Sequence, residues 1–419
     1  MLILVLLLEL ALVTYLVRRY VGLTNILNPI VPLYYYHTVF FFLALLYVER
    51  YNHIVISNEI VYLVMYGYLA FFGTAVLLHV LFRLKNGRIL AGKFENDFST
   101  SGSYWVAAFL LQTAVLVMIF VFYMQKGGLV LADDAENYRV EARKGLGFLV
   151  VIFRWVSEIF TVVGALFIFT ARRVRVGDRL LFWFYYLISI LFMFGLGSRA
   201  FVLDMVVIVV AIYYWSKRRN LDVKMLSLGA VFFVFLGLVG ALRQGFELSG
   251  LIVFEKALWR PFVNFQNFQW IANDFNYTNY LNGASFGIEL STLLPGYQPN
   301  FGTWYKEEFG YNFSGGSITI TYLGEAYANF GLVGALFFPV FLGVIIPLLA
   351  FLLQRRVSFF WVFMSIMVGL SLKGIINVGL GATFVGTVLP VFFCVMCYFF
   401  IRVVLLVFAK KENRNSTAF

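Results

Sequence analysis

Long runs of apolar residues, separated by short polar connectors, make up most of the chain. A run of about 20 residues, folded as an α-helix, crosses the roughly 30 Å hydrocarbon core of a bilayer. We count about eleven such runs, at roughly residues 1–17, 30–48, 60–82, 104–124, 147–170, 179–197, 199–215, 225–242, 330–353, 357–373 and 385–408. The pattern predicts an all-α integral membrane protein with about eleven transmembrane helices.

These runs divide the chain into four parts. Residues 1–242 hold helices one to eight, and residues 243–317 form one large external loop between spans eight and nine. Residues 318–409 hold helices nine to eleven, and residues 410–419 form a cytoplasmic tail. The first run, 1–17, has no basic start and no small-residue cleavage site, so we expect a retained span and not a removable signal.

Basic residues give the orientation, because Lys and Arg in short loops favour the cytoplasmic side of a membrane. With eleven spans, every basic cluster falls on one side, which predicts an external N-terminus and a cytoplasmic C-terminus. The formal net charge of +11 is spread over these loops and forms no single stripe, so nucleic-acid binding is not expected. The clusters are Arg18–Arg19, Arg83–Lys93, Arg172–Arg179, Lys217–Lys224, Arg355–Arg356 and Lys410–Arg414.

The apolar stretch from Leu187 to Trp215 contains only two charged residues, Arg199 and Asp204. If it were one helix, half of the basic clusters would move to the external side, against the usual charge bias. We therefore predict two helices joined by a tight turn at Gly195–Ser198. Arg199 then opens the second helix at the outer face.

Composition excludes most other functional classes. The chain is 62% hydrophobic and 13% charged, far more apolar than a soluble domain. Cys394 and Cys397 lie in the last span and are interpreted as packed apolar residues, and the histidines are scattered. No metal-site signature, phosphate loop or dinucleotide fingerprint is present in the sequence, so no metal and no cofactor is expected.

Two external loops stand apart from the spans. Residues 125–146 carry balanced charge and are interpreted as a solvated lid, with a short surface helix starting near Asp133 or Asp134. In the larger loop, the segment 259–283 alternates aromatic rings with Asn and Gln. Such a segment suits sugar rings, and it equally suits an aromatic belt at the membrane interface. The candidate sugar-binding residues are Trp259, Asn264, Trp270 and Tyr327.

The topology places Arg199, Arg243 and Arg260 at the outer membrane face, where arginine is disfavoured without a partner. A guanidinium binds phosphate oxygens bidentately and stays charged, which suits a diphosphate ligand. The alternative is that each arginine pairs with a carboxylate such as Asp204, Glu247 or Glu255.

Arg154 and Glu158 lie inside span five, one helical turn apart. This spacing predicts an ion pair between them. It also leaves open that Arg154 lines the same diphosphate site as the external arginines.

Four short motifs lie between residues 190 and 350: Gly197-Ser198-Arg199 opening a span, Leu294-Pro295, Thr319 ahead of Gly324-Glu325-Ala326-Tyr327, and Asn329-Phe330-Gly331 with Gly334 leading into the next span. In these motifs residues 190–350 resemble the bacterial O-antigen polymerases, the Wzy-type oligosaccharide repeat-unit polymerases. The resemblance implies a GT-C-like polymerase or ligase architecture in a bacterial inner membrane. The implied enzyme is a metal-independent glycosyltransferase that acts at the outer leaflet.

The same resemblance implies the substrates and partners. Donor and acceptor would be polyprenyl-diphosphate-linked oligosaccharides in membrane lipid, and a chain-length regulator protein would be a partner. The growing chain would move from its lipid diphosphate to the end of a new lipid-linked unit. The reaction requires charge stabilisation on the departing diphosphate and a base for the acceptor hydroxyl.

We assign Arg199 and Arg243 to the diphosphate, with Arg260 third and Arg154 as a further candidate. Glu325 is the favoured general base, because it lies where the external loop re-enters the membrane, and Asp274 and Glu289 are the other candidates. The alternative for Glu325 is a structural carboxylate at a helix end. A single base with direct displacement predicts inversion at the anomeric carbon.

Two other functions are considered. An O-antigen ligase uses the same kind of donor, but a histidine is expected in its large external loop, and residues 243–317 contain none. A lipid-linked oligosaccharide flippase or other transporter is expected to carry internal repeats and charged residues in both membrane halves. The asymmetry between one large external loop and short cytoplasmic loops favours the polymerase.

Overall fold

The computed structural model describes most of the predicted spans. The described residues are 2–25, 27–39, 56–82, 84, 101–125, 147–171, 174–195, 199–217, 227, 231, 234, 238, 263–294, 298–312, 317–354 and 359–416. These residues form helices and connecting turns and contain no strand. The all-helical architecture expected from the hydrophobic pattern is confirmed for this part of the chain.

Six of the described helices are long and apolar enough to cross a membrane. They support a membrane-embedded protein with several spans. Two shorter apolar helices, Phe201–Ser216 and Phe360–Leu372, accompany them within the described residues. The six are Asn58–Leu81, Tyr104–Gln125, Leu149–Thr170, Val176–Gly195, Tyr322–Gln354 and Ile375–Phe393.

The helices group into two compact units. Unit 1 comprises residues 1–87, 220–355 and 368–387, and unit 2 comprises residues 88–219, 356–367 and 388–419. Helices α16 (Phe359–Leu372) and α17 (Ile375–Ser416) contribute residues to both units.

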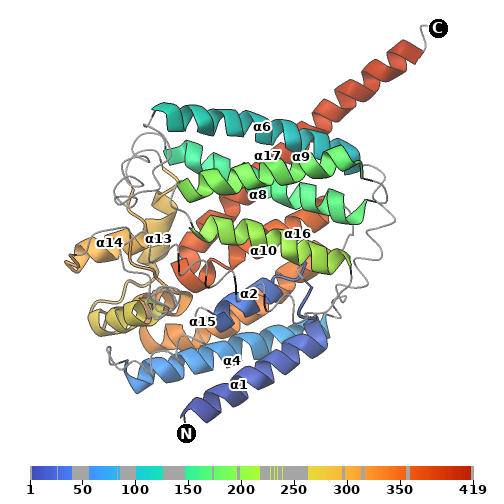
Figure 1. Ribbon diagram of the computed structural model, residues 1–419. Coiled ribbons are helices and arrows are strands. Elements are labelled where there is room, and N and C mark those ends of the chain that lie inside the picture. Colours follow the sequence, from blue (N-terminus) through green and yellow to red (C-terminus); the bar gives the residue numbers. More distant parts are fainter. Residues whose placement is uncertain are drawn as a thin grey trace. The chain divides into compact units, whose positions relative to one another are not determined.

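Unit 2 contains α6 (Ser101–Gln125), α8 (Gly147–Thr170), α9 (Val176–Gly195) and α10 (Arg199–Ser216), which run alongside one another (Figure 1). The end of α9 at Gly195 and the start of α10 at Arg199 confirm the predicted break into two helices. Polar side chains join three of these helices: Gln112 Nε2 donates to Ser157 Oγ over 3.1 Å and to Ser189 Oγ over 2.7 Å. Such bonds between apolar helices fix their register where burial alone is non-directional.

Unit 1 is built around α4 (Asn58–Leu81) and α15 (Tyr322–Gln354), which pack along each other, with α1 (Leu2–Leu16) against α4 (Figure 1). Ser57 caps α4, because its side chain accepts a hydrogen bond from the Ile60 amide over 3.4 Å. A π-helical turn, Val17–Val21, follows α1, and α2 (Ile30–His37) packs on α4.

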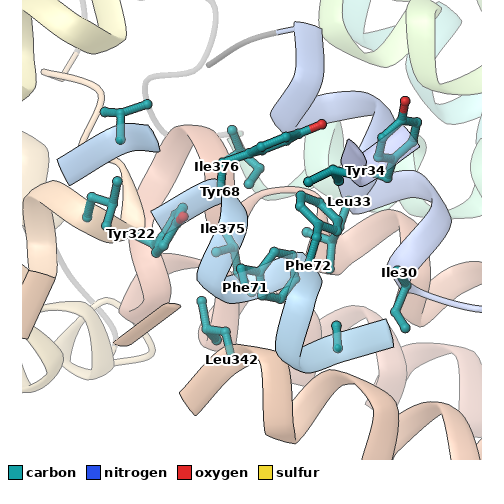
Figure 2. Close-up of a cluster of buried hydrophobic side chains, with 14 of the residues drawn as sticks. Ile30, Leu33, Tyr34, Tyr68, Phe71, Phe72, Tyr322, Leu342, Ile375 and Ile376 are labelled. Carbon is teal, nitrogen blue, oxygen red and sulfur yellow. The ribbon is translucent and has the colours of Figure 1, made fainter. Parts of the chain in front are cut away.

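The core of unit 1 is an aromatic and aliphatic cluster between these helices. Figure 2 shows Phe71 and Phe72 of α4 beside Leu33 and Tyr34 of α2, with Ile375 and Ile376 of α17 and Leu342 of α15 in the same cluster. All of these side chains are buried. Between membrane helices the close packing of such side chains, and not their removal from water, provides the attraction, so the cluster holds α2, α4, α15 and α17 together.

Three short helical segments of unit 1 lie between the spans. They are residues 263–274, α13 (Ala284–Ser291) and α14 (Phe301–Glu308). Asn300 caps α14, because its side chain accepts a hydrogen bond from the Thr303 amide over 2.8 Å. The predicted external loop therefore contains ordered helices in its second half.

Two spans of unit 1 are interrupted by glycine. Helix α15 breaks at Gly331, where φ is +61°, and α17 breaks at Gly379, where φ is +84°. Only glycine adopts this left-handed region without strain. A Cβ atom on Gly331 would also lie 2.3 Å from the Tyr280 hydroxyl oxygen, so the space there admits no side chain.

Candidate functional site

Glu325 lies in the first turn of α15 and is only 1% exposed. Its carboxylate accepts hydrogen bonds from one side chain and two backbone amides. The Ser285 hydroxyl donates to Oε1 over 3.0 Å, the Leu380 amide donates to Oε2, and the Gly381 amide donates to Oε2 over 3.1 Å. These three donors come from chain segments far apart in sequence, so Glu325 ties α13, α15 and α17 together.

The two amides can bind Glu325 because α17 breaks at Gly379. Leu380 and Gly381 open the helical segment that follows, and the first amides of a helical segment have no carbonyl partner within it. The N-terminus of a helix also carries partial positive charge, which stabilises a carboxylate. A Cβ atom on Gly379 would lie 2.6 Å from Glu325 Oε2, so this close approach requires glycine.

Asn329, one turn after Glu325, orients the hydroxyl of Ser285. Asn329 Nδ2 donates to Ser285 Oγ over 2.7 Å and to the Glu325 carbonyl over 2.8 Å. Its Oδ1 accepts from the Gly283 amide over 2.9 Å. A buried chain of hydrogen bonds therefore runs from Asn329 through Ser285 to Glu325 and fixes the direction of the carboxylate.

Glu289 in α13 is the second buried carboxylate and is 4% exposed. Its Oε1 accepts a hydrogen bond over 2.9 Å from the amide of Phe301, the first residue of α14. Glu289 and Glu325 meet at Gly381, where an added Cβ atom would lie 2.9 Å from Glu289 Cγ and 2.9 Å from Glu325 Oε1.

The surroundings of Glu289 change its acidity. Burial raises the pKa of Glu289 to about 7, the Phe301 amide opposes the shift, and the charge of Glu325 adds to it. A carboxyl with a pKa near neutrality can accept and release a proton under physiological conditions. Glu289 is therefore a buried carboxyl beside Glu325 with a raised pKa.

Asp274, the third predicted carboxylate, lies at the end of the helix 263–274. Its Oδ2 accepts hydrogen bonds from the hydroxyls of Tyr305 and Tyr311, the second over 2.6 Å. The structure therefore places Asp274 among aromatic side chains and places Glu289 and Glu325 together at Gly381.

Of the four predicted arginines, Arg154 is the one with a described side chain. Arg154 Nε donates to Glu158 Oε1 over 3.0 Å, which confirms the predicted ion pair. Its guanidinium also lies 4.0 Å from an Asp204 oxygen and over the ring of Phe201. The side chain of Arg199, and Arg243 and Arg260 as a whole, lie outside the described residues.

The predicted sugar-binding residues fall in different surroundings. Asn264 is buried, and its Nδ2 donates to Asn377 Oδ1 over 2.8 Å. Trp270 is half-buried and stacks on Tyr311, and Tyr327 lies edge-on to Tyr280 and Phe268. Trp259, residues 126–146 of the predicted lid 125–146, and most of span eight are outside the described residues.

The structure corrects the start of two spans. The ninth begins at Tyr322 and not near residue 330, so Glu325 and Tyr327 lie inside a helix and not in the loop before it. The eleventh begins at Ile375 and not near residue 385. In both helices the segment before the glycine break contains polar residues, which lower its mean hydropathy. The hydropathy pattern therefore does not indicate where the helix begins.

Sequence reasoning missed Ser285, Leu380 and Gly381. A single serine such as Ser285 gives no signal, and Leu380 and Gly381 act through backbone amides. The closely spaced glycines 379 and 381 inside an apolar run are the one pattern that could indicate a helix break. Within the described residues, no group of three His, Cys, Asp or Glu side chains lies close enough to hold a metal ion.

Comparison with known proteins gives no relative from which a function could be transferred. No family model matches the chain, and no curated protein and no solved structure matches it either.

Proposed function

We propose that the protein is a membrane glycosyltransferase that polymerises polyprenyl-diphosphate-linked oligosaccharide repeat units at the outer leaflet of a bacterial inner membrane. The observation that carries the proposal is the pair of buried carboxylates, Glu289 and Glu325, held at Gly381 between two broken spans. Glu325 lies in a helix that is long and apolar enough to span a membrane, and ionisable groups inside such spans are costly and mark functional sites by default. The resemblance of residues 190–350 to O-antigen polymerases supplies the reaction class.

In this proposal Glu289 is the general base. The acceptor hydroxyl loses its proton to Glu289 while its oxygen bonds to C1 of the donor sugar, and the bond from C1 to the lipid diphosphate breaks. A base works best when its pKa lies near the working pH, which favours Glu289, with a pKa of about 7, for this role. A single displacement of this kind inverts the configuration at C1.

Glu325 is a positioning residue in the same scheme. Its carboxylate is already engaged by Ser285, Leu380 and Gly381, so it holds the segment that faces Glu289. Its negative charge contributes to the raised pKa of Glu289. This role differs from that of a base, because Glu325 acts through Glu289 and through the backbone of α17.

Arginines neutralise the diphosphate in this proposal. Arg199 and Arg243 are assigned to the phosphate oxygens, with Arg260 as the third, because a guanidinium carries a fixed charge in a bidentate geometry. Arg154 has two carboxylates, Glu158 and Asp204, within 4.0 Å, so its charge is balanced by the protein itself. We therefore give Arg154 a structural role.

A transporter of lipid-linked oligosaccharide is the second candidate, and one observation favours it. Spans that break near the site of a bound solute, with a free helix N-terminus at the break, are a feature of secondary transporters. Helix α17 has this form at Gly379. Here, however, the free N-terminus binds Glu325, so the anion at the break comes from the chain itself.

One experiment separates these functions. The gene is deleted in its bacterial host, and surface polysaccharide is separated on a gel. Loss of a polymerase leaves the core with a single repeat unit, whereas loss of a ligase or transporter leaves the core without any repeat. Complementation with wild type is expected to restore the ladder of chain lengths, and complementation with Glu289→Gln is expected to leave the single-repeat band.

A further inference from the structure

A polar and aromatic surface lies at the end of the helix 263–274, apart from the buried carboxylates at Gly381. Trp270 and Tyr311 stack with ring centroids 4.8 Å apart and planes 19° apart, and both are half-buried. Asp274 follows Trp270 by one helical turn. The aromatic pair and the carboxylate therefore belong to one face.

Asp274 is held rigidly on this face. The hydroxyls of Tyr305 and Tyr311 both donate to its Oδ2, and within the described residues these are the hydrogen bonds that its side chain accepts. Burial raises the pKa of Tyr311 to about 12 and that of Tyr305 further, so both hydroxyls stay protonated and keep donating. Carboxylates can accept at both oxygens, which leaves Oδ1 for a ligand hydroxyl.

The turn after Asp274 is equally well ordered. The Asn276 amide donates to Asn279 Oδ1 over 2.6 Å, the Thr278 amide donates to Asn276 Oδ1 over 3.0 Å, and Asn279 Nδ2 donates to the Asp274 carbonyl over 2.8 Å. This network presents the ring of Tyr277, which is 87% exposed. Because the turn is already ordered, a ligand that contacts this exposed ring causes little further loss of conformational entropy.

We propose that Trp270, Asp274, Tyr277 and Tyr311 form a binding surface for the saccharide chain of the substrate. This inference rests on the proposed glycosyltransferase function and adds where the sugars beyond the reacting residue bind. The aromatic rings suit the apolar CH faces of pyranoses, and Asp274 Oδ1 with the neighbouring amides suits their hydroxyl edges.

The surface is physically continuous with the carboxylate site. Trp270 and Tyr311 pack against a buried cluster that contains Phe301 and Ala328. The Phe301 amide binds Glu289, and Ala328 lies one turn after Glu325 in α15. A sugar chain bound at Asp274 is therefore bound on the same rigid group of residues that positions the proposed base.

An interfacial aromatic belt is the competing interpretation of these rings. Belt residues need an apolar ring with a polar tip, and they need no carboxylate fixed by two hydroxyls. The exposed neighbours of Asp274 are the ring of Tyr277 and the side chains of Asn273, Asn276, Thr278 and Asn279, which offer hydrogen bonds. This composition favours a saccharide over lipid tails.

The test measures binding of purified full-length protein in lipid nanodiscs to an array of immobilised oligosaccharides that contain hexoses, N-acetylhexosamines and deoxyhexoses. Wild type is expected to bind at least one class. Trp270→Ala and Asp274→Asn are each expected to weaken that binding at least tenfold, and Trp270→Phe is expected to retain most of it. Trp304→Ala is the matched control, because Trp304 packs on the same buried cluster but stacks on Phe301 and not on Tyr311.

Competition identifies which part of the substrate is bound. Free oligosaccharide of the bound class is expected to displace the protein from the array, and polyprenyl diphosphate without sugar is expected to leave it bound. Displacement by the sugar-free lipid alone would overturn the proposal. So would absence of glycan binding by wild type, or equal weakening by Trp304→Ala.

Two further readouts keep the outcome clear. Asp274→Asn preserves side-chain shape, so loss of binding by this variant with an unchanged gel-filtration profile is not a folding defect. Quenching of Trp270 fluorescence by brominated lipid, measured as the difference between wild type and Trp270→Phe, would place the ring in the membrane and overturn the proposal. Glycan binding requires no turnover, so its result is independent of the gel ladder that tests the proposed function.

Discussion

Glu289 and Glu325 approach each other at Gly381, where each side chain lies 2.9 Å from the position that a Cβ atom would take. The two carboxylates belong to different helices, α13 and α15, and each binds backbone amides at the start of another helical segment. The absence of a side chain at position 381 is therefore what allows the pair to form.

Gly381→Ala is expected to destabilise the protein and abolish chain growth. The added methyl group would contact the Glu325 carboxylate and the Cβ and Cγ atoms of Glu289, and overpacking of this kind costs about 1–3 kcal/mol. Thermal unfolding in detergent measures the loss. Gly287→Ala is the matched control, because nothing lies within 4 Å of its added Cβ in the same neighbourhood, and alanine favours the helix. Equal stability of the two variants would contradict the packing described here.

Glu289→Gln is expected to reduce turnover by about 10²- to 10⁴-fold, the usual contribution of a general base. In wild type, activity is expected to rise with pH through about 7 and then level off, because the base acts only when ionised. A pH profile of polymerisation measures both effects. A wild-type rate that is flat between pH 5 and 8 would exclude Glu289 as the base.

The free energy of unfolding is expected to fall as pH rises, whereas the activity is expected to rise. The pKa of Glu289 in the folded protein, about 7, lies above the ordinary value of 4.5. Protonated Glu289 therefore contributes to the free energy of unfolding in full below about pH 4.5, and this contribution is lost as pH rises through 7. One pKa unit corresponds to about 1.4 kcal/mol, so Glu289→Gln is expected to be more stable than wild type at pH 8, by up to about 3 kcal/mol. Thermal unfolding of both proteins at pH 5 and pH 8 tests the sign.

Glu325→Gln is expected to move the acidic limb of the activity profile to lower pH. Removing the charge of Glu325 removes one of the causes that raise the pKa of Glu289. Glutamine offers one accepting oxygen in place of two, so the variant cannot keep the hydrogen bonds from Ser285, Leu380 and Gly381 together, and some loss of stability is expected. The shift of the pH profile is the readout that a loss of stability alone would not produce. Ser285→Ala, which removes a donor to Glu325 without removing its charge, is the control and is expected to keep the wild-type profile. Complete inactivity of Glu325→Gln at every pH would assign Glu325 a direct catalytic role instead.

Several features of the fold could be predicted from the sequence. Helical spacing alone indicates the ion pair of Arg154 with Glu158, and the charge bias of the loops indicates the break between Gly195 and Arg199. The first depends on residues one helical turn apart, and the second on the distribution of charge along the whole chain. The long apolar runs likewise correspond to the described spans.

The arrangement around Glu325 could not be predicted in this way. Glu325 stands out as a carboxylate in an apolar segment, but its partners Leu380 and Gly381 bind it through backbone amides, which have no sequence signature. Their exposure depends on the break at Gly379, and a glycine in an apolar run also suits plain helix packing. Glu289 likewise becomes prominent only when α13 brings it to Gly381.

The most direct test of the proposed function uses purified protein in nanodiscs with one defined lipid-linked repeat unit. Wild type is expected to yield chains of two or more repeats together with free polyprenyl diphosphate, and Glu289→Gln is expected to yield neither. Absence of longer chains from wild type, or the same chains from Glu289→Gln, would contradict the account.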